Sequence, residues 1–353
     1  TTASLALYDG TPAPEHPGLD DLAGYGREGS APEAGFAVLR TSWEPDASVL
    51  VLQGEHGNVR ENAEGHEHRD ELSFLLHAYG QLLIIDPGYS DWANRDQIEA
   101  PSDHNTILVD GQGAPCGGWW GESGCADGKE DLVEYGVDAH LGDFHQDGSI
   151  AWVQVQVSYR EVTFVRRVLR LDDRFYVIED RALDDTGHNY TLLLNGLAGG
   201  NVPSSSFTML SDGARWAGPK AWVEAHVMPF TSTATYGHAI EEHELAANQV
   251  STHEKLTASA HMSSYAGFLT LLVPGPAGEA APLVETTGNF AGVRAMTWVV
   301  GDRRYVVVSN RTNIEQTATF TGPEPDLART INDGLWVEIL DLSGNSLESH
   351  FIP

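Results

Sequence analysis

The sequence has few basic residues. Lysine and arginine together number 20 against 51 aspartates and glutamates, which gives a formal net charge of −31 over 353 residues. This charge argues against nucleic acid and anionic membrane surfaces as partners, because both repel a strongly acidic protein. If the substrate is itself acidic, its binding site must be locally positive. The acidity otherwise suits a protein that stays soluble in a salty or extracellular setting.

Several other features are missing. The longest apolar run, near residues 268–273, stops at Pro274 and is too short to cross a bilayer. The sequence also lacks a Gly-x-Ser-x-Gly nucleophile motif, a glycine-rich phosphate loop and a Cys-x-x-Cys metal motif. These absences leave no sequence support for a membrane-spanning helix, for serine-nucleophile chemistry or for a phosphate-loop enzyme.

Cysteine is nearly absent. Cys116 and Cys125 are the only two, and they flank the stretch CGGWWGESGC. In an exported protein a disulfide between them would close this loop, whereas in a cytosolic protein they would be two free thiols. The chain begins at Thr1 without a charged and apolar leader, so we expect a processed or excised segment of a longer protein.

Convincing helical periodicity is scarce as well. Residues 240–249 (IEEHELAANQ) are the best short helical candidate. Short segments with alternating apolar residues, or rich in β-branched and aromatic residues, recur instead between turn signals. Examples are FAVLRTSW, LSFLLHAY, QLLIID, SIAWVQVQVSY, EVTFVRRVLRL, RFYVIED and RRYVVVSN. We therefore predict an all-β protein, a large antiparallel β-sandwich without a repeat of fixed period.

The composition predicts how this sandwich is placed along the chain. Residues 1–33 are rich in glycine, proline and acidic residues and show little periodicity, so we predict a linker or arm. Residues 34–353 are predicted to form the sandwich. The stretch PGPAGEAAP marks a loop and a subdivision near residues 274–283.

Two histidines and one aspartate stand out near the first strands. Residues 72–79 and 81–86 predict a hairpin, with His68 just before it and Asp86 at its end, and His104 begins a later apolar strand. Loops and strand ends on a rigid sheet are where functional sites are usually built. Two imidazoles and a carboxylate are a common zinc set that leaves one position open, and Mn²⁺ or Fe²⁺ is an alternative. The histidines could equally be packed or surface residues, since the chain has 15.

Three motifs together resemble the heparinase II/III-like family of polysaccharide lyases, and the oligoalginate lyases of the same superfamily. They are HEHRDELSF, GQLLIIDPG and HNTILVDG, between His66 and Gly111. They are similar to the family's His-x-His-x-Asp-x-x-Ser-Phe pattern, its Asp-x-Gly after the next strand and its His-Asn-Thr strand. The resemblance extends from residue 34 to about residue 310 and implies the family's C-terminal β-supersandwich.

The resemblance also implies a role for each residue. His68, Asp86 and His104 match the family's zinc ligands, and this zinc is expected to be structural. His66 matches the histidine that faces the substrate and would neutralise the carboxylate of a uronic acid. The implied reaction is β-elimination at a 4-linked uronic acid. It also needs a base for the C5 proton and an acid for the leaving oxygen.

The sequence departs from the family in one respect. The family takes its base and acid mainly from an N-terminal α/α-toroid, and nothing before Phe36 could form even one helical hairpin. These groups would then lie on a longer parent chain or a partner chain. This chain offers Tyr89, and Arg95 as a bidentate ligand for a carboxylate. A loop aromatic and a surface arginine are the alternative interpretations of these two residues.

Two other functions stay open. A non-catalytic, zinc-stabilised sandwich that binds an acidic glycan or a partner would account for the missing toroid. A cupin-type metalloenzyme also uses a His-x-His pair, but His68 and Glu71 are separated by too few residues for a cupin motif. The shortage of basic residues favours a non-sulfated uronic-acid polymer, such as alginate, over a sulfated glycosaminoglycan. We expect a secreted or periplasmic bacterial protein.

Overall fold

The fold is nearly all β, as the alternation of apolar residues predicts. The computed structural model describes residues 35–57, 68–88, 100–115, 117–118, 133–134, 136–142, 144–184, 186–231, 233–244, 249–288, 291–320 and 326–353. Helical structure in these ranges is limited to one 3₁₀ turn, η2 (Pro101–Asp103). The same ranges contain no helix long and apolar enough to span a membrane. The predicted arm and both cysteines lie outside the described residues.

The first sheet has eight strands in the order β1-β2-β3-β4-β13-β18-β17, with β5 also paired to β13. Its strands are β1 (Phe36–Arg40), β2 (Val49–Gln53), β3 (Phe74–Ala78), β4 (Gln81–Ile84), β5 (Ile107–Val109), β13 (His188–Gly196), β17 (Thr235–Glu244) and β18 (Val250–Met262). Because β18 takes one edge of β13 along its whole length, β4 and β5 share the other edge. The end of β4 and the start of β5 therefore meet beside the C-terminal half of β13, between Leu192 and Gly196.

The second sheet has nine strands in the order β14-β15-β16-β19-β12-β11-β10-β8, with β9 paired to β10. Its strands are β8 (Ala139–Leu141), β9 (His145–Asp147), β10 (Ile150–Tyr159), β11 (Val162–Leu171), β12 (Phe175–Leu183), β14 (Ser206–Leu210), β15 (Gly213–Ala217), β16 (Ala221–Pro229) and β19 (Gly267–Pro276).

The third sheet has five strands in the order β20-β21-β22-β25-β26. Its strands are β20 (Val284–Thr287), β21 (Val293–Val300), β22 (Arg303–Asn310), β25 (Gly334–Asp341) and β26 (Ser346–Ile352). Two small sheets complete the described structure: β23 (Gln316–Phe320) with β24 (Leu327–Ile331), and β6 (Gly117–Gly118) with β7 (Val133–Glu134).

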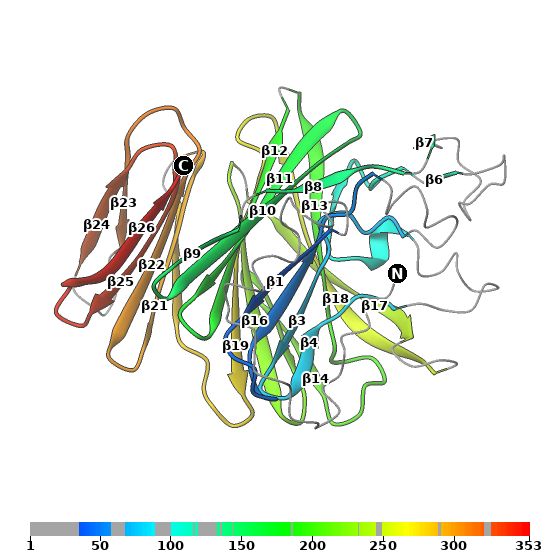
Figure 1. Cartoon of the computed structure of the whole chain (residues 1–353), viewed down its shortest axis with the longest axis horizontal. Helices are drawn as coiled ribbons and strands as arrows, with labels where there is room; N and C mark the ends of the chain where they lie inside the picture. Colours follow the sequence, from blue (N-terminus) through cyan, green and yellow to red (C-terminus); the bar gives the residue numbers. More distant parts are fainter. Residues whose placement is uncertain are drawn as a thin grey trace.

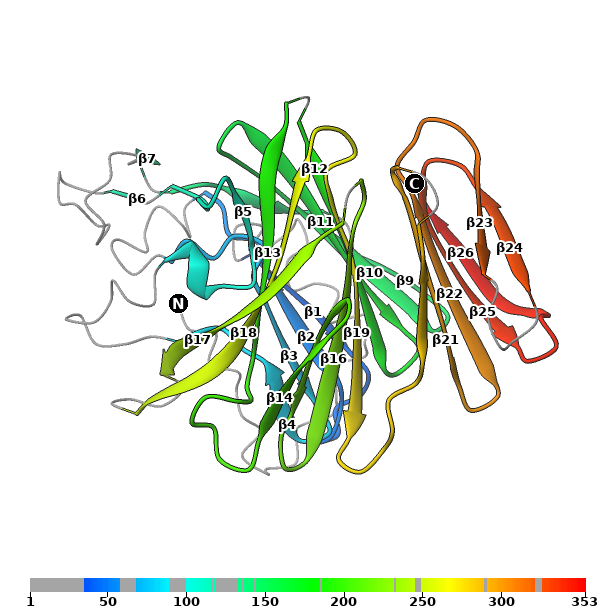
Figure 2. The same cartoon turned by 180° about the vertical axis from the view of Figure 1, so that it is seen from behind.

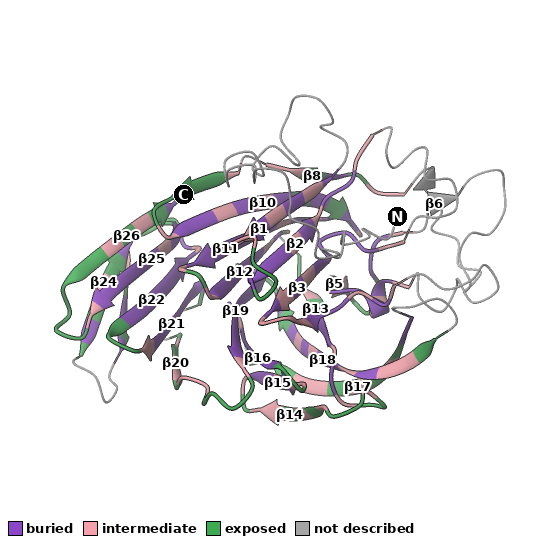
Figure 3. Ribbon diagram, turned by 60° about the horizontal axis from the view of Figure 1, so that its bottom comes forward, coloured by how far each residue is buried: buried purple, intermediate pink, exposed green. Residues whose placement is uncertain are grey.

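The nine-stranded sheet is the central layer of the molecule. In Figures 1 and 2 the blue strands β1–β3 lie on one side of it and the orange to red C-terminal sheet lies on the other. Its strand β11 alternates accordingly: Phe164 and Val168 join the core shared with the first sheet, whereas Leu169 and Leu171 join the core shared with the third. Figure 3 shows the buried residues concentrated along these central strands. The predicted β-sandwich is therefore confirmed, in layered form.

The predicted subdivision falls between the second and third sheets. Strand β19 ends at Pro276 and β20 begins at Val284. Residues from both sides of this stretch, such as Leu271 and Val307, share one apolar cluster, so the third sheet packs directly on the central one. A domain boundary near residues 274–283 stays a prediction.

The helical candidate was wrong over residues 240–244, and residues 245–248 lie outside the described residues. Residues 240–244 form the end of β17, which pairs with β18 residue by residue from Thr235 to Glu244. Ten backbone pairings outweigh the modest helix propensity of a short glutamate-rich segment, because propensity is a weak preference that tertiary pairing overrides.

Candidate metal centre

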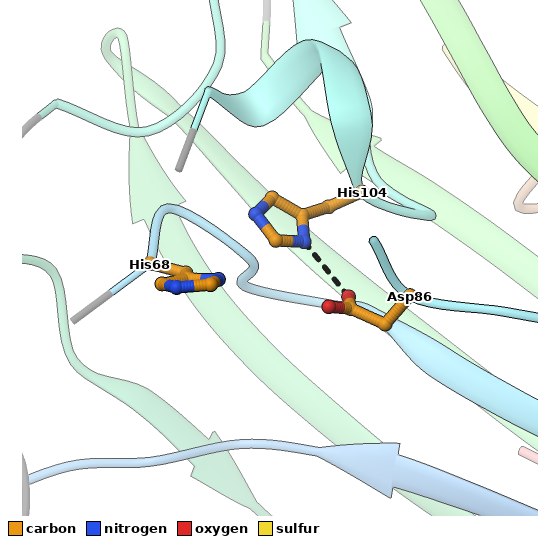
Figure 4. A group of neighbouring side chains, drawn as sticks. All are labelled: His68, Asp86 and His104. Carbon is orange, nitrogen blue, oxygen red and sulfur yellow. Dashed lines mark hydrogen bonds and ion pairs between the residues drawn. The ribbon is translucent and has the colours of Figure 1, made fainter. Parts of the chain in front are cut away.

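His68, Asp86 and His104 converge at the place where the end of β4 meets the start of β5 (Figure 4). One potential ligand atom from each residue lies within 4.8 Å of the others. The His104 Nδ1 lies 2.8 Å from Asp86 Oδ2, and the His68 and His104 rings are 5.4 Å apart between centroids. The structure thus brings together the three residues that the sequence singles out as metal ligands.

The hairpin before Asp86 places its carboxylate. Tyr79 and Gly80 both have positive φ, 52° and 71°, which is the backbone of the tight turn that suits a two-residue hairpin. The register of β3 on β4 starts at this turn and shifts between Leu76 and His77, and the Ser73 hydroxyl donates to Asp86 Oδ2 at 3.2 Å. The predicted hairpin is confirmed, and Asp86 lies across from the start of its first strand, as expected.

Asn105 holds the segment that carries His104. Its side-chain amide donates to the carbonyls of Phe74 and Ile85, at 2.8 and 2.7 Å, and its carbonyl accepts the backbone N–H of Asn195 at 2.7 Å. Because Asn105 is fully buried, these bonds replace ones that water would make in the unfolded chain. The Asn105 side chain therefore ties the segment that carries His104 to β3, to the end of β4 and to β13.

His104 and Asp86 shift each other's pKa inside the centre. Burial alone would lower the pKa of His104, but the charge and the hydrogen bond of Asp86 raise it to about 9. Burial would raise the pKa of Asp86, yet His104 holds it below its ordinary value. Without a metal the pair is therefore an imidazolium and a carboxylate. A metal, which needs a neutral imidazole, would have to displace this proton.

The residues present fit a metal such as zinc. Tetrahedral coordination with bonds of about 2.1 Å places ligand atoms about 3.4 Å apart, so small side-chain shifts from the observed cluster suffice. In addition, His104 Nε2 is buried and has no hydrogen-bond partner among the described residues. A buried polar atom without a partner often marks the position of an ion or water. That a metal binds here stays a prediction.

A row of buried polar side chains continues from the centre across β18 to β17. The Asn195 amide donates to the Asp103 carbonyl at 3.0 Å, so its oxygen accepts from His253 Nε2 at 3.0 Å. His253 Nδ1 is then an acceptor, and His243 Nδ1 donates to it at 3.0 Å. Burial lowers the pKa of both histidines, that of His253 to about 3. Both rings are therefore neutral at physiological pH.

The predicted catalytic residues cannot be placed. His66, Tyr89 and Arg95 lie outside the described residues. Conversely, the structure adds site residues that sequence reasoning missed, namely Asn105 and the row through Asn195, His253 and His243. For Asn105 a signal existed, because it stands next to His104 in the HNTILVDG motif, whereas nothing in the sequence links residues 243 and 253 to that motif.

These features define the class of the protein: a layered antiparallel β-sandwich with a candidate metal centre of two histidines and a carboxylate at the ends of its strands. The chain belongs to the heparinase II/III-like family. The family model described as "Heparinase II/III-like, C-terminal" matches residues 26–266. The resemblance inferred from the three motifs is thus confirmed. No curated protein matches the sequence.

Solved structures share the fold. A heparinase III structure superposes with a TM-score of 0.61 at 16% identity and covers 85% of this chain. A heparan sulfate lyase, HepC from Pedobacter heparinus, gives 0.55 at 17% identity over 75% of this chain. A further heparinase III gene product gives 0.60 at 14% identity over 86%. The chain corresponds to only 42%, 40% and 42% of these three structures, respectively.

Proposed function

We propose that the protein supplies the β-sandwich half of a polysaccharide lyase that acts by β-elimination at a 4-linked uronic acid. The observation that carries the proposal is that the family match over residues 26–266 coincides with the convergence of His68, Asp86 and His104. Family membership leaves the cupin alternative without support. The structural neighbours include a protein named as a heparan sulfate lyase, which agrees with this reaction class.

The chemistry sets three tasks for such a site. The C5 proton is weakly acidic because the negative charge left on its removal delocalises into the C6 carboxylate. The enzyme must therefore neutralise the carboxylate, accept the proton and protonate the leaving oxygen. We assign the first task to His66, which is two residues from His68 and so within about 7 Å of it along the backbone. Tyr89 and Arg95 are this chain's candidates for contact with the reacting sugar.

The proposed metal is zinc, with Mn²⁺ as the alternative, held by His68, Asp86 and His104. When bound, it would act as a cross-link between three chain segments, and the protein itself would perform the proton transfers. His104 and Asp86 already attract each other, so the ion would mainly fix His68, and with it the neighbouring His66. A proton-transfer pair from an α/α-toroid, on a longer parent chain or a partner chain, would complete the active site.

The substrate class is a uronic-acid polysaccharide or oligosaccharide. Lys255, a basic residue described near the centre, is already paired: it is buried against Glu241 at 2.7 Å and donates to the Ser102 carbonyl. A sulfated chain would need several uncommitted cations, so we favour a non-sulfated uronate such as alginate. Secretion or a periplasmic location would give access to such polymers.

A second candidate is a non-catalytic sandwich that binds an acidic glycan. It is favoured by the burial of His104, because a metal held there would stabilise the sandwich without contact to a sugar. In that case the metal centre would stabilise a binding surface, and no bond of the sugar would be cleaved.

Elemental analysis and an elimination assay on the purified chain distinguish these candidates. Elimination creates a conjugated double bond that absorbs in the ultraviolet, so alginate, heparan sulfate, hyaluronan and chondroitin can each be followed directly. Bound zinc with rising absorbance supports the lyase. Bound zinc with polysaccharide binding but no product supports the binding module, and the assay is then repeated with a toroid-bearing parent or partner. Metal-free protein after incubation with zinc would refute the assigned centre.

A further inference from the structure

The core beneath the metal centre contains a buried cation. Arg166, on β11 of the central sheet, has no exposed surface, and its partner Asp180 is also buried. The guanidinium binds both carboxylate oxygens of Asp180, with Nε to Oδ1 at 2.6 Å and Nη2 to Oδ2 at 3.1 Å. Its planar fork is therefore fixed in orientation by a bidentate ion pair.

The remaining arm of this guanidinium reaches the first sheet. Nη1 donates to the Leu72 carbonyl at 2.6 Å and to the Asn105 carbonyl at 2.7 Å. Leu72 lies in the loop that carries His68, and Asn105 directly follows His104. One nitrogen thus joins the two segments that supply the histidines of the candidate centre.

The backbone of the His68 loop is set for this contact. Leu72 has a φ of 72°, in the left-handed region that a leucine rarely adopts, and so its conformation needs support from the surrounding structure. The bond from Arg166 to its carbonyl provides such support. The guanidinium carbon also lies 5.6 Å from the centre of the Phe74 ring, on the strand that follows the loop.

Stability alone does not explain an arginine at this position. Taking two charges out of water is expensive, and apolar residues of similar volume are often as stable as a buried ion pair. Burial even raises the pKa of Asp180 in spite of the attraction of Arg166. What an apolar pair could not do is donate to two carbonyls at once.

We propose that Arg166, oriented by Asp180, is a positioning residue for the metal centre and sets the separation between the His68 loop and the His104 segment. This inference rests on the metal site of the proposed function. It assigns Arg166 no contact with the metal, and it predicts an effect on metal affinity from a residue in the core of the sandwich.

The neighbouring Arg167 is a matched control. It lies on the same strand but faces the opposite side of the sheet, and it is also buried. Its guanidinium pairs with Glu179 at 3.1 Å and donates to the carbonyl of Pro353, far from the centre in the fold. Replacing Arg167 therefore breaks a comparable buried ion pair without touching either histidine segment.

The test compares Arg166→Met, Arg166→Lys and Asp180→Asn with Arg167→Met and Arg167→Lys in the whole chain. Zinc affinity is measured by competition with a chromogenic chelator, and Co²⁺ in place of zinc reports ligand geometry through its visible spectrum. We expect the Arg166 and Asp180 variants to lose zinc affinity by about tenfold to a hundredfold and to change the Co²⁺ spectrum. The Arg167 variants should keep the wild-type zinc affinity and Co²⁺ spectrum, even where their melting temperature falls.

Each outcome decides the question. Equal zinc affinity and Co²⁺ spectra in the Arg166 and Arg167 variants, with wild-type zinc binding intact, would overturn the inference alone. A wild-type chain that binds no zinc would overturn the metal site of the proposed function and the inference with it. If Arg166→Met fails to fold, Arg166→Lys and Asp180→Asn give the answer, since a lysine keeps the charge but cannot form the fork that bridges two carbonyls.

Discussion

His104 Nδ1 lies 2.8 Å from Asp86 Oδ2, so a residue from a strand end and one from a separate loop form a hydrogen bond in the interior of the protein. His104 is fully buried, and Asp86 keeps 24% of its side chain exposed. Of these two side chains, only Asp86 is accessible to solvent. In the proposed lyase, the exposed side of Asp86 is the side on which a metal would enter and on which His66, two residues from His68, would meet the sugar.

Removing either histidine should remove the metal. His68→Ala and His104→Ala are expected to abolish stoichiometric zinc binding. Their melting temperatures should fall at least as far as that of the wild type falls when a chelator is added, because a bound metal stabilises only the folded state. Elemental analysis and thermal unfolding with and without chelator measure both effects. His188→Ala, which removes an imidazole paired with Asp110 elsewhere on the first sheet, is the control and should keep its zinc. Unchanged zinc in His68→Ala would show the assignment to be wrong.

Zinc affinity should rise with pH. In the metal-free protein the pKa of His104 is raised to about 9, so at pH 7 the ring is protonated and a metal must displace the proton. Between pH 6 and pH 9 we expect the zinc dissociation constant to fall by up to about tenfold for each pH unit. Competition titrations across this range, with the chelator's own protonation corrected, measure the slope. A flat profile would mean that His104 is already neutral or is not a ligand.

Asn105 should contribute more to the stability of the fold than the small size of its side chain suggests. Asn105→Ala leaves two buried carbonyls and one N–H without partners, and each such group costs about 1–3 kcal/mol, so the free energy of unfolding should fall by more than about 2 kcal/mol. Denaturant titration measures this loss. Asn189→Ala, at an exposed asparagine of β13 that bonds Asp110, is the matched control and should change stability little. A loss no larger than that of the control would show that the Asn105 side chain does not hold these strands together.

The sequence predicts the metal centre because its signals are local. His68, Asp86 and His104 all follow or precede recognisable strands, and the turn at Tyr79–Gly80 joins the two strands of the hairpin that ends at Asp86. Alternation of apolar residues gives the all-β class for the same reason. Each of these signals depends on residues within a few positions of one another, and the resemblance of the three motifs to the family joins the three ligands into one set.

The parts that escaped prediction depend on contacts between distant segments. Arg166 donates to Leu72 across 94 positions, and His253 accepts from a histidine on a neighbouring strand after Asn195 has fixed its ring. Residues 240–249 are the best helical candidate by local propensity, but residues 240–244 pair with the next strand, β18, and this pairing overrides the preference. A single sequence does not show which sheets pack against each other.

A second pH effect concerns stability away from the metal centre. Burial would lower the pKa of His226, but Asp212 and Glu224 raise it from 6.5 to about 9. Because the folded pKa is the higher one, this stabilisation is complete below pH 6.5 and is lost as the pH rises to 9. The stabilisation lost over this pH range corresponds to about 3 kcal/mol of unfolding free energy. Unfolding free energies at pH 6 and pH 9 should therefore differ less in His226→Gln than in the wild type. His238→Gln, at a more exposed histidine paired with Glu254, serves as control and should keep the wild-type difference.

His66 is expected to act on the substrate and not on the metal. If it neutralises the uronate carboxylate, His66→Ala should keep stoichiometric zinc and the wild-type melting temperature and lower kcat/KM by about a hundredfold or more, as removal of one preorganised charge-stabilising group usually does. His261→Ala, at an exposed histidine of β18, provides the control and should retain activity. The ultraviolet elimination assay, run on the form of the protein that shows activity, measures the ratio. Loss of zinc in His66→Ala would make it a metal ligand, whereas full activity on every uronate polymer would remove it from the site.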